Sequence, residues 1–517
     1  VEAGVGIGKS FAYIVPILYY IKTYRRPVVI ATSTIALQEQ LIGDIDKIMD
    51  MLNYDVEVLI AKGQNHFLCK NRLEECFTRE FLEEKEEYKA QFCRDKCSYR
   101  DSCHYYDLRQ KMMYTHGIIV CNQDLLAVNM HKRASLRRQL MSEDIGIIVV
   151  DEAHNLESKV RSSVTSYITL SKLKDAMLAA GKAVNAYDNE FNKELEQLED
   201  YFQFFESLNK ENSSNDIFWM ERDRGLRGVK WIRLYSCPKE VDRIIDKIMF
   251  EESELSVVLT SATITSGKSE NYIKSYAYFM KSTGFPAKRG MICEPKISPF
   301  NYDEHAMIYY TEHMPHPTNE RDKFIEEGVK EIIRLLQISN GKALILFTAK
   351  TDMNAVYDKL KEEKLPFKIL MQQGNSKQSE TLEKFRKDTN SVLLGTGSYW
   401  EGINIEGLSL SHVIIFRLPF PVREPIIDYK YQQCNNGLME VSVPEMIIKL
   451  KQGIGRLIRS ENDKGIVSII DSRVGEKSKA PYKHIIWESL PIKNRTNKIE
   501  EIADFYRRVV EVKENYE

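Results

Sequence analysis

Three groups of residues in this 517-residue chain have types and spacings suited to phosphate chemistry. The first is the segment AGVGIGKS, in which glycines at three alternate positions precede a lysine and a serine: Gly4, Gly6, Gly8, Lys9 and Ser10. Glycines let backbone amides approach phosphate oxygens. A lysine adds positive charge at the terminal phosphates, and a serine hydroxyl can bind Mg²⁺. The segment predicts a nucleotide phosphate loop, although a glycine turn before a core helix would look similar.

Two further groups could complete such a site. Asp151 and Glu152 follow the hydrophobic run IGIIVV, so Asp151 could hold Mg²⁺ and Glu152 could orient the attacking water. Arg456 and Arg459 are three residues apart, so we expect them on one face of a helix, with Gln452 one turn earlier. There they could stabilise charge on a γ-phosphate. Taken alone, each group could be an acidic turn or a solvated basic helix face, but together they predict a nucleotide site divided between two lobes.

The elements that position these groups are short apolar runs rich in β-branched residues, which indicate buried parallel strands. They are RPVVIATS, GIIVCNQDLL, IGIIVVDEAH, LSVVLTSATI, KALILFTAK, FKILMQQG, SVLLGTGSYWEG, SHVIIFRLP and KGIVSIID. Ligands of open parallel sheets bind at the carboxyl ends of the strands, where the candidate residues fall. We predict an α/β fold with two doubly wound parallel-sheet lobes.

Changes in pattern give the domain boundaries. The first lobe comprises residues 1–64, 111–157 and 249–300, and the second lobe comprises 301–517. A cysteine-bearing insertion fills 65–110, and amphipathic charged segments such as NKELEQLEDYFQFFESL predict an inserted helical domain at 158–248. Only Val1 and Glu2 precede the phosphate loop. Because such a loop is normally fed by a strand, we expect the natural chain to begin further upstream.

The composition excludes some classes of protein. An apolar content of 43% and a charged content of 29% are ordinary for a globular protein. The net charge of −2 provides no overall basic field, so nucleic-acid binding would need a local groove. No apolar run approaches the roughly 18 residues that cross a bilayer, so we expect no membrane association.

Four cysteines are grouped with 23, 3 and 5 intervening residues: Cys69, Cys93, Cys97 and Cys103. Such a group favours a metal over disulfides, and four thiolates suit either zinc or a 4Fe–4S cluster. Cys76 lies among them and could be an alternative ligand, although a buried free thiol is the favoured interpretation. Isolated positions elsewhere are interpreted as core or incidental cysteines: Cys121, Cys237, Cys293 and Cys434.

Seven segments, in this order, resemble the motifs of the XPD/DinG family of iron–sulfur DNA helicases in superfamily 2. They are VEAGVGIGKS, ATSTIALQEQL, VVDEAH, LTSATI, GTGSYWEGINIEG, RLPFPVREP and QGIGRLIR. The resemblance covers nearly the whole chain and is weakest at 158–245, where that family has its helical Arch domain. It departs from the family at Val5 and Ile7, where threonines are usual. The resemblance implies two RecA-like lobes, ATP with Mg²⁺, and a 4Fe–4S cluster on the four cysteines.

The same resemblance suggests contacts to single-stranded DNA. Hydroxyl and amide side chains at strand ends could bind phosphates: Thr32, Ser33, Thr34, Gln38 and Asn122. Tyr399 or Trp400 could stack on a base. Glu401, Gly402 and Asn404 resemble the motif that couples DNA to the nucleotide cleft. Helix capping for the hydroxyls, and a core role for the aromatics, are the alternative interpretations.

These observations predict an ATP-dependent DNA helicase that moves 5′→3′ on single-stranded or forked DNA, including R-loops, in repair or replication. The direction comes from the resemblance alone. We expect a monomer in the bacterial cytoplasm, associated with the nucleoid. The alternatives are an ATPase that remodels nucleic-acid complexes without processive unwinding, and an inactive scaffold.

Overall fold

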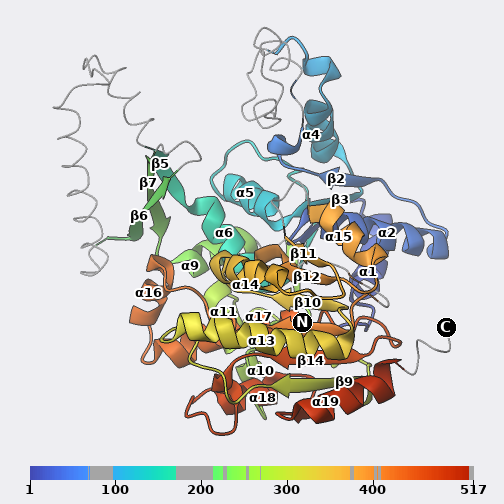
Figure 1. Ribbon diagram of the computed structural model, residues 1–517. Coiled ribbons are helices and arrows are strands. Elements are labelled where there is room, and N and C mark those ends of the chain that lie inside the picture. Colours follow the sequence, from blue (N-terminus) through green and yellow to red (C-terminus); the bar gives the residue numbers. More distant parts are fainter. Residues whose placement is uncertain are drawn as a thin grey trace, which may run out of the picture.

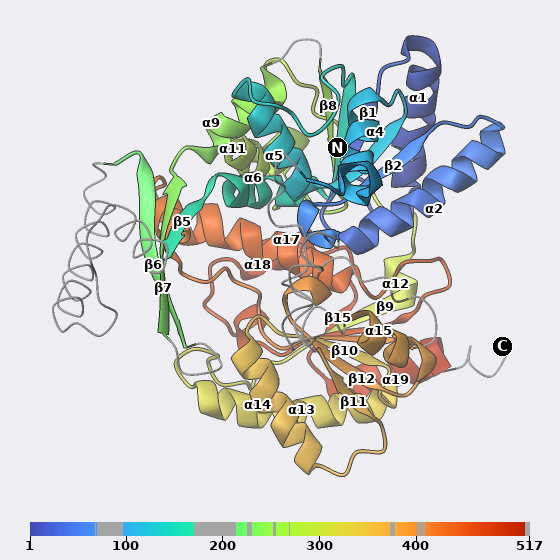
Figure 2. The same cartoon turned by 90° about the horizontal axis from the view of Figure 1, so that it is seen from above.

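A computed structural model describes residues 1–67, 69, 97–169, 214–224, 230–251, 255–267, 269–372, 378–400, 405 and 409–511. Two parallel sheets form the centres of two lobes (Figures 1 and 2). The first sheet has the order β2 (Val58–Ala61), β3 (Ile118–Asn122), β1 (Val28–Thr32), β4 (Ile147–Asp151) and β8 (Ser256–Thr260). The second has the order β11 (Ile369–Met371), β12 (Val392–Gly395), β10 (Ala343–Leu346), β13 (His412–Ile415), β14 (Gly465–Ile469), β9 (Ala306–Tyr310) and β15 (Arg495–Thr496).

The described helices of the first lobe are α1 (Lys9–Tyr24), α2 (Ile35–Leu52), α4 (His104–Tyr114), α5 (Gln123–Ala134), α6 (Leu156–Val164), α9 (Val241–Ile245), α10 (Tyr272–Ser275) and α11 (Ala277–Thr283). Those of the second lobe are α12 (Tyr302–His305), α13 (Arg321–Ser339), α14 (Lys350–Glu362), α15 (Gln378–Lys387), α16 (Pro425–Gln432), α17 (Val443–Ile454), α18 (Lys483–Ser489) and α19 (Ile499–Tyr506). Within the described residues, no helix combines the length and apolar character needed to cross a membrane.

Both faces of the first sheet are covered, as the continuous apolar strands predict. Val29 and Ile148 are register partners and pack with α5 and α6, whereas the next pair, Ile30 and Val149, packs with α1 and α2. Successive residues of a strand point to opposite faces, so these two clusters require helices on both sides. The prediction of two doubly wound α/β lobes is confirmed, and every strand predicted from an apolar run is present.

The phosphate loop begins at the edge of the first sheet. Glu2 forms a parallel bridge with Ser261 just beyond β8, and Ala3 forms one with Lys296. The Ala3 amide donates to the Ser261 carbonyl at 2.8 Å. Glu2 and Ala3 therefore run alongside the end of β8 and lead the loop to the carboxyl ends of β4 and β8.

The inserted domain predicted as helical at 158–248 contains strands as well as helices among its described residues. A three-stranded antiparallel sheet, β5 (Ser166–Thr169), β7 (Lys230–Pro238) and β6 (Asp216–Arg224), projects beside the two lobes (Figure 1). Tyr167, Tyr235 and Trp219 are aligned across it, with ring centroids 5.5 and 5.0 Å apart. Cross-strand aromatic pairs stabilise sheets, and they outweigh the helical tendency of the charged residues. The segment 192–208, which suggested helices, lies outside the described residues.

Tyr399 and Trp400 lie in the core of the second lobe rather than on a surface. Both side chains are fully buried, and the Trp400 indole donates from Nε1 to the Phe347 carbonyl at 2.8 Å. Neither ring can stack on a base in this conformation, so the core role applies. The GTGSYW segment thus places aromatic residues beneath the loop that follows β12.

We therefore predict that Trp400→Ala lowers the stability of the protein by about 3–5 kcal/mol, because it leaves a cavity in a packed core. Denaturant unfolding followed by circular dichroism measures this change. The control is Tyr19→Ala, in which the ring is 59% exposed, with an expected change within about 0.5 kcal/mol. Unchanged stability together with weakened single-stranded DNA binding in Trp400→Ala would support base stacking instead.

Candidate nucleotide site between the lobes

The phosphate loop has a backbone that glycine permits. Gly6 and Gly8 have φ values of 83° and 75°, in the left-handed region that other residues rarely adopt. A Cβ atom on Gly6 would lie 2.1 Å from Phe300 Cζ, whereas nothing lies within 4 Å of the same position on Gly8. Gly8 precedes α1, so the helix N-terminus and its positive dipole face the open side of the loop.

Lys9 joins the loop to the acidic pair that ends β4. Its Nζ lies 2.7 Å from Asp151 Oδ1 and 3.2 Å from Glu152 Oε1. Burial would raise the pKa of Glu152, but the charges of Lys9 and His154 and a hydrogen bond from Ser261 outweigh it, so the pKa lies below its usual range. Burial would lower the pKa of Lys9, but the two carboxylates raise it. Lys9 and Glu152 therefore form a charged pair at neutral pH, whereas burial raises the pKa of Asp151 above its usual range.

A hydrogen-bonded relay leads from Glu152 to the second lobe. Ser261 Oγ donates to Glu152 Oε2 at 2.9 Å and lies 2.8 Å from His154 Nδ1. On the other side of the imidazole, Nε2 contacts Gln452 Nε2 at the end of α17. A serine after β8, the histidine of the DEAH segment and a glutamine of the other lobe thus form one path. His154 had no predicted role, although its place in the VVDEAH segment was a usable signal.

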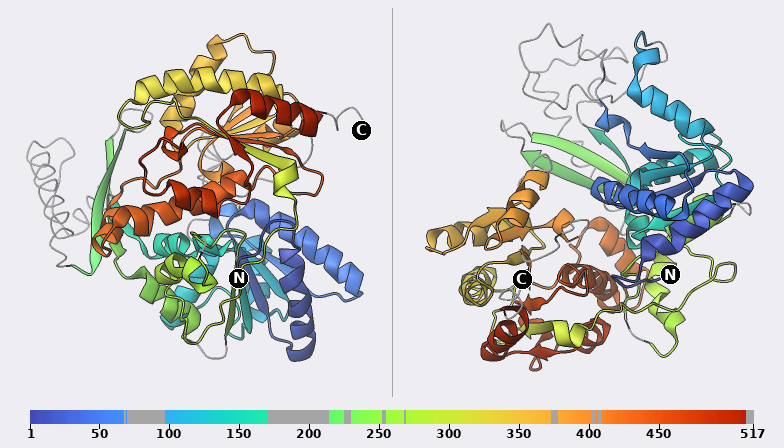
Figure 3. Two further views of the ribbon diagram at one scale, coloured as in Figure 1. Left: turned by 90° about the horizontal axis from the view of Figure 1, so that it is seen from below. Right: turned by 90° about the vertical axis from the view of Figure 1, so that its right-hand side faces the viewer.

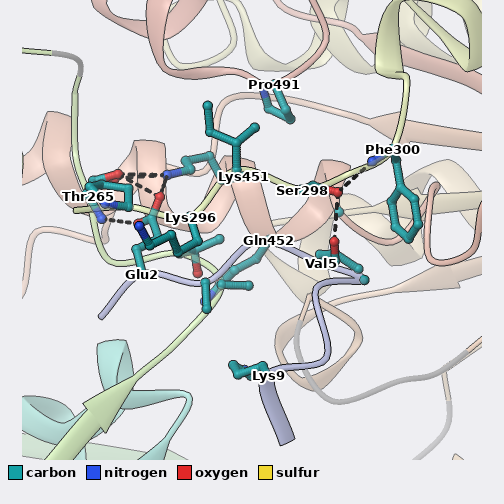
Figure 4. Close-up of a pocket in the computed structure, with 18 of the residues that line it drawn as sticks. Glu2, Val5, Lys9, Thr265, Lys296, Ser298, Phe300, Lys451, Gln452 and Pro491 are labelled. Atoms are coloured by element: carbon teal, nitrogen blue, oxygen red, sulfur yellow. Dashed lines mark hydrogen bonds and ion pairs between the residues drawn. The ribbon is translucent and has the colours of Figure 1, made fainter. Parts of the chain in front are cut away.

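The residue before Gln452 makes a second contact between the lobes. Lys451 Nζ lies 3.0 Å from Glu2 Oε1, 3.1 Å from Thr265 Oγ1 and 3.2 Å from the Thr265 carbonyl. Figure 4 shows Lys451 and Gln452 reaching toward the first lobe, with Lys9 below them. Neither Lys451 nor Glu2 was predicted as a site residue, because a pair of residues 449 positions apart gives no local pattern in the sequence.

Arg456 and Arg459 lie beyond α17, not on it. The helix ends at Ile454; Arg456 follows in a turn, and Arg459 lies just beyond that turn. A Cβ atom on Gly453 would lie 2.8 Å from the Trp400 ring, so this end of the helix packs too closely for a larger residue. Arg456 Nε donates to the Trp400 carbonyl at 3.1 Å. The prediction of a shared helix face is wrong.

The structure nevertheless brings the predicted nucleotide residues together. A cavity of about 830 Å³ between the lobes is lined by the phosphate loop, the acidic pair and the residues that follow α17: Gly4, Gly6, Gly8, Lys9, Ser10, Asp151, Glu152, Gln452, Arg456 and Arg459. The chemistry of these donors fits a magnesium nucleotide. The Lys9 ammonium already stands beside the Asp151 carboxylate, where a cation is required.

The predicted DNA contacts at strand ends have mixed roles. Thr34 caps α2 by accepting from the Leu37 amide at 3.3 Å, and Asn122 caps α5 by accepting from the Leu125 amide at 2.9 Å. Three other candidates are buried, and their side-chain polar atoms have no hydrogen-bond partner among the described residues: Thr32, Ser33 and Gln38. Helix capping therefore accounts for Thr34 and Asn122. Buried polar groups without hydrogen-bond partners cost free energy, so Thr32, Ser33 and Gln38 would gain partners from a bound ligand or from a change of conformation.

The cysteine group is only partly described. Cys69, Cys97 and Cys103 are partly exposed, and Cys93 lies outside the described residues, as does Gly402. Where the chain is described, no group of three or more histidine, cysteine or acidic side chains is close enough to hold a metal. Cys121 and Cys237 are buried in the first lobe, which agrees with their interpretation as core residues.

Comparisons with known proteins give the family of the chain. The helicase C-terminal domain family matches residues 332–492, and the DEAD_2 family matches residues 60–173. The ATP-dependent DNA helicase YoaA of Haemophilus influenzae is 25% identical over 98% of this chain and 92% of its own length. The ATP-dependent helicase DinG of Mycobacterium tuberculosis is 24% identical, with the same coverage. A Bacillus subtilis protein named 3′-5′ exonuclease DinG is 23% identical over 98% of this chain and 68% of its own.

Solved structures share the fold. A structure described as an XPD helicase superposes with a TM-score of 0.60 at 16% identity and covers 96% of each chain. Xpd4 of S. tokodaii gives a TM-score of 0.51 at 14% identity over 92% of each chain. The two-lobed arrangement seen from below in Figure 3 is therefore one that known structures share.

The conformation of the loop leads to a prediction for Gly6→Ala. The substitution places a Cβ in the left-handed region, at a cost of about 1–2 kcal/mol, and against the Phe300 ring. We expect about tenfold weaker binding of a fluorescent ATP analogue. The control is Gly43→Ala inside α2, where nothing lies within 4 Å of the added Cβ. That variant should bind normally and be slightly more stable. Equal ATP affinity in the two variants would contradict the assigned role of the loop.

Proposed function

This chain belongs to the XPD/DinG-like family of superfamily 2 helicases, and on that premise we propose that it uses ATP to move along single-stranded DNA and separate strands. The observation that carries the proposal is the continuous polar path from the phosphate loop to the second lobe. Lys9 contacts Glu152, Glu152 accepts from Ser261, and His154 contacts Gln452. A site built from both lobes can convert the loss of a γ-phosphate into a movement of one lobe against the other.

The proposed chemistry assigns each side chain a task. Lys9 would leave its carboxylate partners to hold the terminal phosphates, and Asp151 with Ser10 would hold Mg²⁺, which supplies charge neutralisation when bound. Glu152 would orient the attacking water, because its low pKa keeps it ionised as an acceptor. Arg456 and Arg459 would stabilise the charge that develops on the transferred phosphoryl group.

DNA is proposed to cross the carboxyl ends of the strands in both lobes. Thr32, Ser33 and Gln38 are the candidates that retain unpaired polar atoms, and hydroxyl and amide donors to phosphate bind without reading sequence. The net charge of −2 limits general attraction, so such a track would be local. We further propose 5′→3′ movement, action as a monomer on forked DNA or R-loops in repair, and a location at the bacterial nucleoid.

The ATP site is tested by two variants of the full-length protein. Lys9→Ala should lose ATP binding, because the cation at the phosphate loop is gone. Glu152→Gln should bind ATP but hydrolyse it about 10²–10⁴-fold more slowly, because only the orienter of water is lost. DNA-stimulated phosphate release and equilibrium ATP binding measure the two effects.

The control for these variants is Lys323→Met, which removes only an exposed ion pair with Glu320 and should hydrolyse ATP normally. DNA-stimulated hydrolysis that persists in both Lys9→Ala and Glu152→Gln would defeat the site assignment. Strand displacement from forks with 5′ or 3′ overhangs then tests direction. Hydrolysis without displacement of bare forks, but with clearance of protein-blocked DNA, would favour the remodelling ATPase.

We also propose that Cys69, Cys93, Cys97 and Cys103 hold a 4Fe–4S cluster that stabilises the small domain around them. Four thiolates suit such a cluster, and the partial exposure of Cys69, Cys97 and Cys103 leaves them accessible for ligation. Cys121 is unsuited to ligation, because burial raises the pKa of its thiol far above the ordinary value.

The purified protein should accordingly contain about four iron and four sulfide per chain and absorb visible light. Cys97→Ser should lose the iron and the colour, because one of the four thiolate ligands is removed. Cys293→Ser, which changes a partly exposed cysteine of the first lobe, should keep both. Stoichiometric zinc in the wild-type protein, with no sulfide, would overturn the assignment.

A further inference from the structure

We infer that Lys451 is a positioning residue: its ion pair with Glu2 holds the end of α17 in the place from which Arg456 and Arg459 face the nucleotide. This inference rests on the proposed ATPase function and deepens it. Lys451 belongs to the second lobe and Glu2 to the first, and the side chains are only 13% and 11% exposed. The pair is thus a largely buried ionic contact across the line along which the lobes must separate.

The Glu2 carboxylate joins three segments of the site. One oxygen accepts from the backbone amides of Ile264 and Thr265, just beyond the SAT residues, while the other accepts from Lys451. The backbone of Glu2 continues directly into the phosphate loop and is itself bridged to Ser261. A change at the phosphates can therefore reach Lys451 through the single residue that precedes the loop.

Lys451 is closely connected to the arginines on its other side. Its carbonyl accepts from the Gly455 amide at 2.9 Å, and the Gly453 carbonyl accepts from the Arg456 amide at 3.2 Å. The turn that carries Arg456 is thus built on the last turn of α17. Anchoring the Lys451 side chain to the first lobe fixes where that turn begins, and displacement of a catalytic group by about 1 Å can reduce a rate about 100-fold.

The contact is distinct from the relay through His154. Gln452 reaches the DEAH segment, whereas Lys451 reaches the start of the phosphate loop and the segment after SAT. Adjacent residues therefore bind separate parts of the first lobe. Two anchors restrict rotation of the helix end in a way that one hydrogen bond does not.

A double-mutant cycle in the full-length protein tests the inference. Glu2→Gln keeps an acceptor for the two backbone amides but removes the charge, and Lys451→Met keeps the aliphatic stem. We expect each variant to lower kcat for DNA-stimulated ATP hydrolysis by about 10- to 100-fold. The KM for ATP should change less than about threefold, because ground-state binding is retained. The double variant should be no slower than the slower single variant, and Lys451→Arg should recover most of the rate.

Combining Lys451→Met with substitutions of the two arginines distinguishes positioning of the arginines from direct contact of Lys451 with the nucleotide. In an Arg456→Ala/Arg459→Ala background, Lys451→Met should lower kcat by less than about twofold, because nothing remains to be positioned. The Lys323→Met and Glu320→Gln variants, which break an exposed pair, serve as matched controls with a wild-type rate. A wild-type protein without ATPase activity would defeat the proposed function itself. An active wild-type protein with unaffected Glu2→Gln, or additive losses in the cycle, would overturn only this inference.

Discussion

The Glu152 carboxylate has partners on two sides, and the rest of the site depends on this arrangement. Lys9 neutralises one oxygen from the phosphate loop, and Ser261 donates to the other from the end of β8. A buried carboxylate needs such partners. In the proposed mechanism Lys9 turns to the nucleotide, and Glu152 then keeps its partners Ser261 and His154 on the other side.

The second lobe contributes through one short stretch of chain. Near the end of α17, Lys451 and Gln452 contact the first lobe. Arg456 lies in the turn that follows the helix, and Arg459 lies just beyond that turn. Figure 2 shows α17 along the boundary between the lobes. A second polar group lies nearer the other end of this helix, where Lys430 contacts Glu157 of the first lobe and Glu445 of α17. The ion pairs therefore join α17 to the first lobe directly near one end and through Lys430 near the other.

The fold could be predicted from the sequence because its strands are continuous apolar runs, such as VVIAT and IIVVD, whose burial on both faces leaves few alternatives. The grouping of the candidate nucleotide residues could be predicted because phosphate binding demands glycines, a lysine and carboxylates at short spacing. The end of α17 at Ile454 and the burial of Trp400 could not be predicted from the sequence, because both result from packing between residues distant in the chain. The Lys451–Glu2 ion pair could not be predicted for the same reason, because its two residues lie 449 positions apart. The sheet at 216–238 was missed because charged residues mask its cross-strand aromatic pairs.

The central claim is that the two lobes form one nucleotide site. An experimental structure with a non-hydrolysable ATP analogue and Mg²⁺ tests it most directly. The account predicts that Lys9 leaves Asp151 for the terminal phosphates, while Arg456 and Arg459 lie within hydrogen-bonding distance of the γ-phosphate. A bound nucleotide with both guanidinium groups directed away from it, and with Lys9 still paired to the carboxylates, would contradict the account.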